Sequence, residues 1–288
     1  MTPKEFQELL NQTMLTSIEK GKAWHQYKAE SPNEAIAFVK NIENKLASIR
    51  KSLLLKTSPV PYKIWGEKYI EPEAITQMEG AARVPVAVAG ALMPDAHMGY
   101  GLPIGGVLAT ENSVIPYAVG VDIACRMMLS LYPSSPQVLK NPKNSEYKHL
   151  YSALLNHTIF GSGAAGVHDG KIEHPILDKS HWELSSLTRS LRQTAIYQIG
   201  TSGGGNHFVE WGELEILNAE NPLNLAVGHY LALLSHSGSR GVGFKIANHY
   251  TKIAMEQMTE LDQSVKHLAW LPLDRDLGIE YWAAMQLA

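Results

Sequence analysis

Short apolar runs separated by glycine-rich polar clusters fill most of this sequence and limit what it can fold into. Four runs have the length and apolar content of strands: residues 84–93 (VPVAVAGALM), 105–110 (GGVLAT), 113–121 (SVIPYAVGV) and 127–132 (MMLSLY). Helical stretches are predicted near residues 146–156, 182–196 and 243–261. Because strands and helices do not alternate regularly, the pattern predicts an α+β fold with mixed sheets flanked by helices.

The first 56 residues are predicted to be helical. Thr2 and Ser31 are each followed by a proline and then by a glutamate two residues beyond it, an arrangement that caps and starts a helix. After the second cap, spacings of three and four predict one buried stripe: Ile36, Val39, Ile42, Leu46, Ile49 and Leu53. Prolines within residues 57–66 break this pattern. We therefore expect an N-terminal helical extension over residues 1–56 and a main domain over residues 57–288.

Composition restricts the cellular setting and the partners. With 288 residues, 45% of them hydrophobic, the chain is long enough to bury a substantial core. One cysteine cannot form an internal disulfide, and the N-terminus has no apolar signal region, so a cytoplasmic protein is expected. No apolar run approaches the roughly 20 residues needed to cross a bilayer, so no membrane partner is expected. A formal net charge of -3 gives no overall attraction to nucleic acid, so an RNA partner would need a local site.

The single cysteine, Cys125, lies three residues after Asp122 at the end of an apolar run. A lone cysteine is most often a small buried hydrophobic residue. However, a thiolate, a carboxylate and imidazoles together form a ligand set for Zn²⁺ or Mn²⁺. His207 and His236 can complete such a set, since both lie in glycine-flanked turns that we expect to follow strands. The sequence favours metal binding by these four residues over separate structural roles.

Two glycine-rich segments suggest phosphate binding. In residues 200–210 (GTSGGGNHFVE), successive glycines free backbone N–H groups to point at an anion. The segment lacks the lysine of a P-loop and the spacing of a dinucleotide-binding fingerprint, so neither fold is supported. A flexible hairpin turn is the alternative reading. Residues 235–243 (SHSGSRGVG) add Arg240, whose guanidinium suits a phosphate.

Four motifs, in order along the chain, resemble those of the RtcB family of GTP- and Mn²⁺-dependent RNA ligases. They are residues 93–106 (MPDAHMGYGLPIGG), 114–127 (VIPYAVGVDIACRM), 200–211 (GTSGGGNHFVEW) and 236–243 (HSGSRGVG). The resemblance covers residues 62–288. It implies an RtcB-like fold and an enzyme that joins an RNA 3′-phosphate or 2′,3′-cyclic phosphate to a 5′-hydroxyl, in tRNA splicing and RNA repair, through a guanylated histidine.

The resemblance also implies roles for individual residues. Cys125 would bridge two Mn²⁺ ions, with Asp122 and His207 on one ion and His236 on the other. The remaining implied roles are GTP contacts by Asn206, Phe208 and Glu210, an RNA phosphate contact by Arg240, and a place beside the metal centre for Asp95 and His97. Because Zn²⁺ binds thiolate and imidazole more tightly than Mn²⁺ does, we expect Zn²⁺ to occupy or inhibit the site.

The chain departs from the family pattern in two respects. Ala124 and Arg126 stand where we expect glycine on both sides of Cys125. In addition, no histidine of this chain matches the family motifs for a further metal ligand and for the guanylated histidine, which the resemblance places beyond residue 288. The resemblance therefore predicts a C-terminally incomplete ligase that cannot complete ligation alone and binds metal partially. The alternatives are a metal-dependent phosphoesterase and a non-catalytic RNA- or nucleotide-binding remnant.

The last twelve residues support the same expectation. Residues 277–288 (LGIEYWAAMQLA) predict the start of an amphipathic helix with Ile279, Trp282 and Ala283 on one face. No capping glycine or basic last turn ends this pattern before the final residue.

Overall fold

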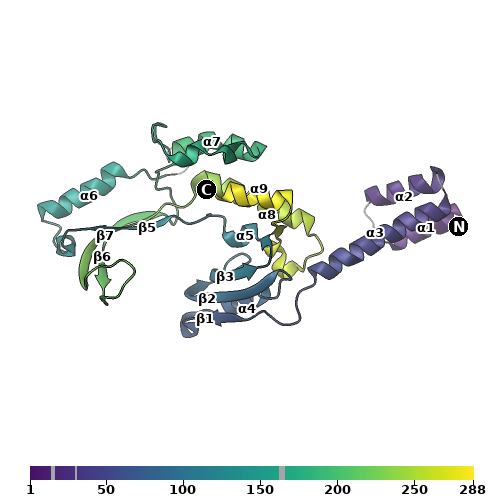
Figure 1. The fold of residues 1–288 in the computed structure, drawn as a ribbon, viewed down its shortest axis with the longest axis horizontal. Coiled ribbons are helices and arrows are strands. Elements are labelled where there is room, and N and C mark those ends of the chain that lie inside the picture. The colour runs from purple at the N-terminus through teal and green to yellow at the C-terminus, as the bar shows by residue number, and fades with distance from the viewer. Residues whose placement is uncertain (14–16, 30, 162–165) are drawn as a thin grey trace. The chain divides into compact units, whose positions relative to one another are not determined.

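A computed structural model describes residues 1–13, 17–29, 31–161 and 166–288. The chain divides into two compact units. Unit 1 comprises residues 1–99, 103–109 and 258–266, and unit 2 comprises residues 100–102, 110–257 and 267–288. Small sheets flanked by helices form both units, so the expected α+β fold is confirmed (Figure 1). None of the described helices is long and apolar enough to cross a membrane.

The N-terminal part of unit 1 is helical, as predicted. Helices α1 (Pro3–Gln12) and α3 (Pro32–Leu53) begin at the two predicted caps, where the hydroxyls of Thr2 and Ser31 accept hydrogen bonds from backbone N–H groups in the first turn. Helix α2 (Ser17–Ala29) lies between them in the chain. Their shared core consists of Phe6, Leu10, Ala23, Ala35 and Val39.

The predicted stripe on α3 is only partly correct. Val39 and Leu53 are buried, but Ile49 is 38% exposed, and the Leu46 side chain lies outside the described part of the chain. The stripe fails at Ile49 because the core contacts of α3 gather in its first half, where Ala35 and Val39 pack against Phe6 and Leu10. Helix α3 ends at Leu53, and the domain boundary at residue 56 stays a prediction.

The rest of unit 1 is built on a three-stranded sheet in the order β1 (Tyr62–Ile64), β2 (Ala87–His97), β3 (Ile104–Thr110). Strand β1 runs parallel to β2 and pairs Tyr62 with Gly90. Helix α4 (Pro72–Ala81) packs against β2. The predicted strands at 84–93 and 105–110 therefore correspond to β2 and β3.

Unit 2 contains a three-stranded antiparallel sheet in the order β5 (Met127–Tyr132), β7 (Gly228–His236), β6 (Phe208–Ile216), visible as the curved sheet in Figure 1. The prediction of a strand at 127–132 is confirmed. The prediction at 113–121 is wrong beyond β4 (Ser113–Val114), because Pro116 starts the short helix α5 (Pro116–Val119). Strand β4 instead pairs with β8 (Leu271–Pro272).

Helices complete unit 2. The predicted helices correspond to α6 (Ser145–His157), α7 (Ser186–Gln198) and α8 (Arg240–Gln257), and α9 (Asp276–Met285) follows. Short 3-10 helices lie at Pro175–Asp178 and Ser180–Glu183. The predicted face of the last helix is wrong, since Ile279 and Trp282 are about half exposed while Gly278, Tyr281 and Ala284 are buried. The cause is packing against α8, where the rings of Tyr281 and Tyr250 lie 5.1 Å apart.

Candidate metal centre

Sheet register brings the four predicted ligands to one end of the β5–β7–β6 sheet. His236, the last residue of β7, pairs with Met127 on one side and with Phe208 on the other. Cys125 lies two residues before Met127, and His207 lies directly before Phe208. The loop between α5 and β5 carries Asp122 and Cys125. We expected the two histidines to lie in turns after strands and the other two ligands to lie at the end of an apolar run. Instead, the loop with Asp122 and Cys125 follows helix α5, His207 precedes β6, and His236 is the last residue of β7.

The ligating atoms lie close together. One atom from each of Asp122, Cys125 and His236 falls within 4.8 Å of the others. The Nε2 atoms of His207 and His236 are each 3.5 Å from Oδ2 of Asp122, and the two imidazole rings lie 4.9 Å apart. We call Asp122, Cys125 and His236 the ligand trio. The structure brings His207 next to this trio, and ligation by any of the four stays a prediction.

Two atoms of the trio lack partners of the usual kind. Oδ2 of Asp122 and Nε2 of His236 are buried and make no hydrogen bond within the described residues. Buried polar atoms are nearly always hydrogen-bonded, and these two lie 3.5 Å from each other without a hydrogen bond, which requires an explanation. A cation between them supplies one, since carboxylate, imidazole and thiolate are all ligands for Zn²⁺ and related ions. The residues present therefore fit a metal ion.

Hydrogen bonds fix the carboxylate of the trio. The N–H and hydroxyl of Ser239 donate to Oδ1 of Asp122 at 2.7 and 3.2 Å, which leaves Oδ2 directed at the histidines. Burial alone would raise the pKa of Asp122, but the Ser239 hydrogen bonds and the nearby His207 together lower it. Burial, followed by the charge of Asp122, raises the pKa of the Cys125 thiol. A bound cation would oppose this second effect, because it stabilises the thiolate.

The backbone around Cys125 adopts a left-handed conformation over three residues. The φ angles of Ala124, Cys125 and Arg126 are 72°, 48° and 55°. Residues with a Cβ rarely take this conformation, and each costs about 1–3 kcal/mol. Glycine takes it without that penalty. Positions 124 and 126, where the family pattern leads us to expect glycine, therefore both have the positive φ that glycine favours.

Arg240 holds the glycine-rich loop against the cluster. Its guanidinium donates to Oγ1 of Thr201 at 3.2 Å and to the carbonyl of Gly161 at 3.1 Å, and it lies 3.2 Å from Nδ1 of His207. Arginine can only donate, so Nδ1 of His207 is the acceptor and Nε2 carries the proton. Ligation through Nε2 of His207 would therefore require a change of tautomer and a new partner for Arg240. His207 therefore lies beside the trio, but its ring is held by Arg240.

The other predicted site residues lie as follows. Asp95 and His97 are exposed on β2 in unit 1, and Nδ1 of His97 lies 2.9 Å from the carbonyl oxygen of Asp95. The Phe208 ring lies 5.7 Å from that of His236, and Asn206 is exposed in the turn before β6. Glu210 lines a cavity of about 300 Å³ between α6 and β6. Their roles beside GTP or metal stay predictions.

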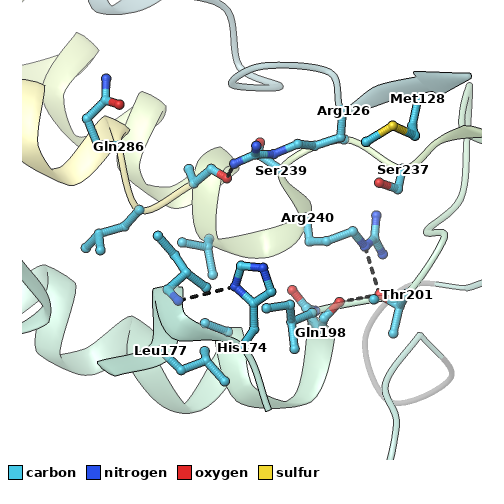
Figure 2. Close-up of a pocket in the computed structure, with 18 of the residues that line it drawn as sticks. Arg126, Met128, His174, Leu177, Gln198, Thr201, Ser237, Ser239, Arg240 and Gln286 are labelled. Atoms are coloured by element: carbon cyan, nitrogen blue, oxygen red, sulfur yellow. Dashed lines mark hydrogen bonds between the residues drawn. The ribbon is translucent and has the colours of Figure 1, made fainter. Parts of the chain in front are cut away.

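A second cavity, of about 430 Å³, opens in unit 2 beside the trio (Figure 2). Arg240 and Ser239 line it, together with segments that sequence reasoning did not select, among them His174, Trp182 and Gln198. The side-chain oxygen of Gln198 accepts a hydrogen bond from the N–H of Gly241 in the first turn of α8. These three residues carry no sequence signal of a site, because they reach it only through the packing of α7 against α8 and against the 3-10 helices Pro175–Asp178 and Ser180–Glu183.

Known proteins match most of this chain. A model of the family described as tRNA-splicing ligase RtcB matches residues 77–186 and 168–288. The RNA-splicing ligase RtcB of Escherichia coli (strain K12) is 29% identical over 220 residues, covering 72% of this chain and 50% of that protein. The tRNA-splicing ligase RtcB of Thermococcus kodakarensis is 26% identical over 259 residues, covering 77% and 52%. That of Aeropyrum pernix is 31% identical over 222 residues, covering 65% and 44%.

The chain spans about half the length of these curated relatives. The two matched ranges together contain the ligand trio, the glycine-rich loop and Arg240. Because the family model matches more than half of the residues, this chain belongs to the RtcB family of tRNA-splicing ligases.

Proposed function

We propose that this chain carries the metal-binding half of a GTP- and Mn²⁺-dependent RNA ligase that joins an RNA 3′-phosphate or 2′,3′-cyclic phosphate to a 5′-hydroxyl. The observation that supports it most directly is the ligand trio, whose atoms approach within 4.8 Å and include two buried atoms without hydrogen bonds. The matched relatives are RNA-splicing and tRNA-splicing ligases, which supports RNA as the substrate. The single cysteine in this cluster also supports a reducing, cytoplasmic setting.

In this proposal the chain's own residues position the reacting groups. Asp122, Cys125 and His236 would hold Mn²⁺, joined by His207 once its contact with Arg240 is exchanged for ligation. A bound divalent ion supplies Lewis acidity toward a phosphoryl oxygen. Ser239 keeps the Asp122 carboxylate directed at the ion through its two hydrogen bonds. Arg240 would then exchange its contact with His207 for one with an RNA phosphate, while it keeps its hydrogen bonds to Thr201 and Gly161.

We propose that GTP binds on the side of the cluster formed by Asn206, Phe208 and Glu210. Phe208 packs edge-on against His236, and Glu210 follows on the same face of β6. Asn206 precedes them in the exposed turn. A nucleotide here would lie between the trio and the cavity that Glu210 lines. No histidine of this chain matches the guanylated histidine of the family, so we propose that these 288 residues do not take up GMP covalently.

One experiment tests the proposal against its alternatives. The protein is incubated with Mn²⁺ and α-³²P-labelled GTP, and then with a 5′-hydroxyl RNA and an RNA ending in a 2′,3′-cyclic phosphate. We expect Mn²⁺-dependent RNA binding, no covalent label and no joined product from this chain alone. Covalent GMP on a histidine would overturn the proposal that these 288 residues do not take up GMP. Removal of the terminal phosphate without labelling would favour a phosphoesterase, and loss of both metal and RNA binding would overturn the proposal.

A further inference from the structure

The cavity beside the trio has one apolar wall and one polar rim. The side chains of Ile176, Leu177 and Trp182 line the wall, and Leu177 and Trp182 are buried. Hydroxyl and guanidinium groups line the rim, supplied by Ser237, Ser239, Arg126 and Arg240. In Figure 2, Arg126 and Ser239 lie on one side of the cavity, and His174 and Leu177 lie on the other. A flat apolar group joined to an anion complements this arrangement.

Ser239 connects the rim to the ligand trio. It lines the cavity, and its N–H and hydroxyl donate to Asp122. Ser239 therefore lies between an anion at the rim and the Asp122 carboxylate. The volume of about 430 Å³ falls within the roughly 300–1,000 Å³ of small-molecule sites. The cavity can thus enclose one nucleotide, and it cannot enclose a folded partner.

The two arginines have different tasks at this rim. The guanidinium of Arg240 already contacts Thr201, His207 and Gly161, so it mainly holds the rim in place. Arg126 donates to the main-chain oxygen of Ala288 and keeps further N–H donors for an anion. It also stands where the family pattern leads us to expect glycine, with the positive φ that glycine would favour. Arg126 therefore adds to the cavity a cation that the expected glycine would not supply.

We propose that this cavity holds the phosphate-bearing terminal nucleotide of the RNA strand, with its base against Leu177 and Trp182 and its phosphate paired with the guanidinium of Arg126. Arg126 is then a specificity-determining residue of this chain. The inference rests on the proposed function, since it assumes that RNA is the substrate.

Variants on α7 test the cavity without touching the trio. Ala195 lines the cavity, and Ala195→Phe would fill it. Gln193 is exposed on the same helix, so Gln193→Phe is the matched control. The probes are adenosine 2′,3′-cyclic monophosphate and a fluorescein-labelled single-stranded RNA ending in a 2′,3′-cyclic phosphate. Affinities are measured by calorimetry and fluorescence polarisation with Mn²⁺ present, and the metal content and thermal unfolding of each variant are compared with the wild type.

The expected results separate the inference from the proposed function. Ala195→Phe and Arg126→Met should each weaken binding of both probes about tenfold or more, Arg126→Lys should recover part of the loss, and Gln193→Phe should bind as the wild type does. Wild-type affinity in both Ala195→Phe and Arg126→Met, with metal content unchanged, would overturn the inference and leave the proposed function standing. A wild-type protein that binds metal but neither probe would overturn both.

Discussion

At the residue scale, the candidate metal centre depends on backbone conformations that most residue types rarely adopt. Ala124, Cys125 and Arg126 follow one another with positive φ, and only glycine takes that conformation without strain. Sequence reasoning identified both flanking positions as departures from a family pattern. It could not show that the departures carry backbone strain, because φ is set by the loop that brings Asp122 and Cys125 to His236.

Replacement of Ala124 by glycine should relieve part of this strain. We expect Ala124→Gly to raise the free energy of unfolding by about 1 kcal/mol, because glycine favours positive φ more than its added freedom in the unfolded state costs. Urea denaturation followed by circular dichroism measures the change. Ala37→Gly, on the exposed side of α3, is the control and should lower the free energy by about 1 kcal/mol. If both variants are destabilised equally, the strain at Ala124 is absent.

Gly203 should tolerate no side chain. Its φ is 87°, and a Cβ there would overlap the guanidinium of Arg240 and Nδ1 of His207. Gly203→Ala should therefore displace both groups, lower the free energy of unfolding by about 1–3 kcal/mol and weaken metal binding. Gly212→Ala is the matched control, because a Cβ at Gly212 meets nothing within 4 Å. Equal metal affinity and equal stability in the two variants would contradict this account of the loop.

At the scale of the elements, the sequence predicted individual segments better than their partners. The run at 127–132 was recognisable as a strand because it is short, apolar and bounded by polar residues. Strand β7 pairs with β5 on one side and with β6 on the other, and the register of these two pairings cannot be read from the residues of any one strand. That register places His236 opposite both Met127 and Phe208, so the convergence of the cluster belongs to the sheet and not to any one motif.

The contact between α8 and α9 shows the same dependence on tertiary packing. The sequence stripe through Ile279 and Trp282 predicted the wrong face, because periodicity finds apolar residues but does not show which of them meets a neighbour. The face that packs uses Tyr281 and the small residues Gly278 and Ala284. Beside it, the hydroxyl of Tyr250 donates to Glu280 at 2.5 Å, while the hydroxyl of Tyr281 has no hydrogen bond within the described residues.

These two tyrosines give a paired prediction. Tyr250→Phe should lower the free energy of unfolding by about 1–2 kcal/mol, because it leaves Glu280 without its donor. Tyr281→Phe removes a buried hydroxyl that has no partner, so it should leave stability unchanged or raise it slightly. Both values come from urea denaturation of the full chain. A larger loss in Tyr281→Phe than in Tyr250→Phe would show that the helices pack differently.

At the scale of the whole molecule, the ligand cluster lies within the ranges that match the RtcB family. The family motifs in the sequence were sufficient to predict the family and the residues of the cluster. They were not sufficient to predict the Arg240 contact with His207, nor the cavity beside Ser239, because both arise from segments far apart in the sequence.

Metal binding should stabilise the folded chain. A ligand that binds only the native state adds about 2.7 kcal/mol at a free concentration of one hundred times its Kd. We expect Zn²⁺ to reach this effect at lower concentrations than Mn²⁺, because thiolate and imidazole favour zinc. Thermal unfolding with each metal, and after addition of EDTA, measures the shift. The absence of stabilisation by either ion would contradict metal binding by the folded chain. Equal stabilisation of His236→Ala and the wild type would show that the metal binds outside the cluster.

The count of metal ions bound per chain tests the central claim most directly, namely that Asp122, Cys125 and His236 together hold a metal. Wild type, Cys125→Ala and Asp122→Asn are each loaded with Zn²⁺ or Mn²⁺ and passed through a desalting column. Bound metal is then measured by inductively coupled plasma mass spectrometry, with Gly212→Ala as the control. We expect bound Zn²⁺ in the wild type and the control, and its loss in both cluster variants. Wild-type metal content in Cys125→Ala would contradict the account.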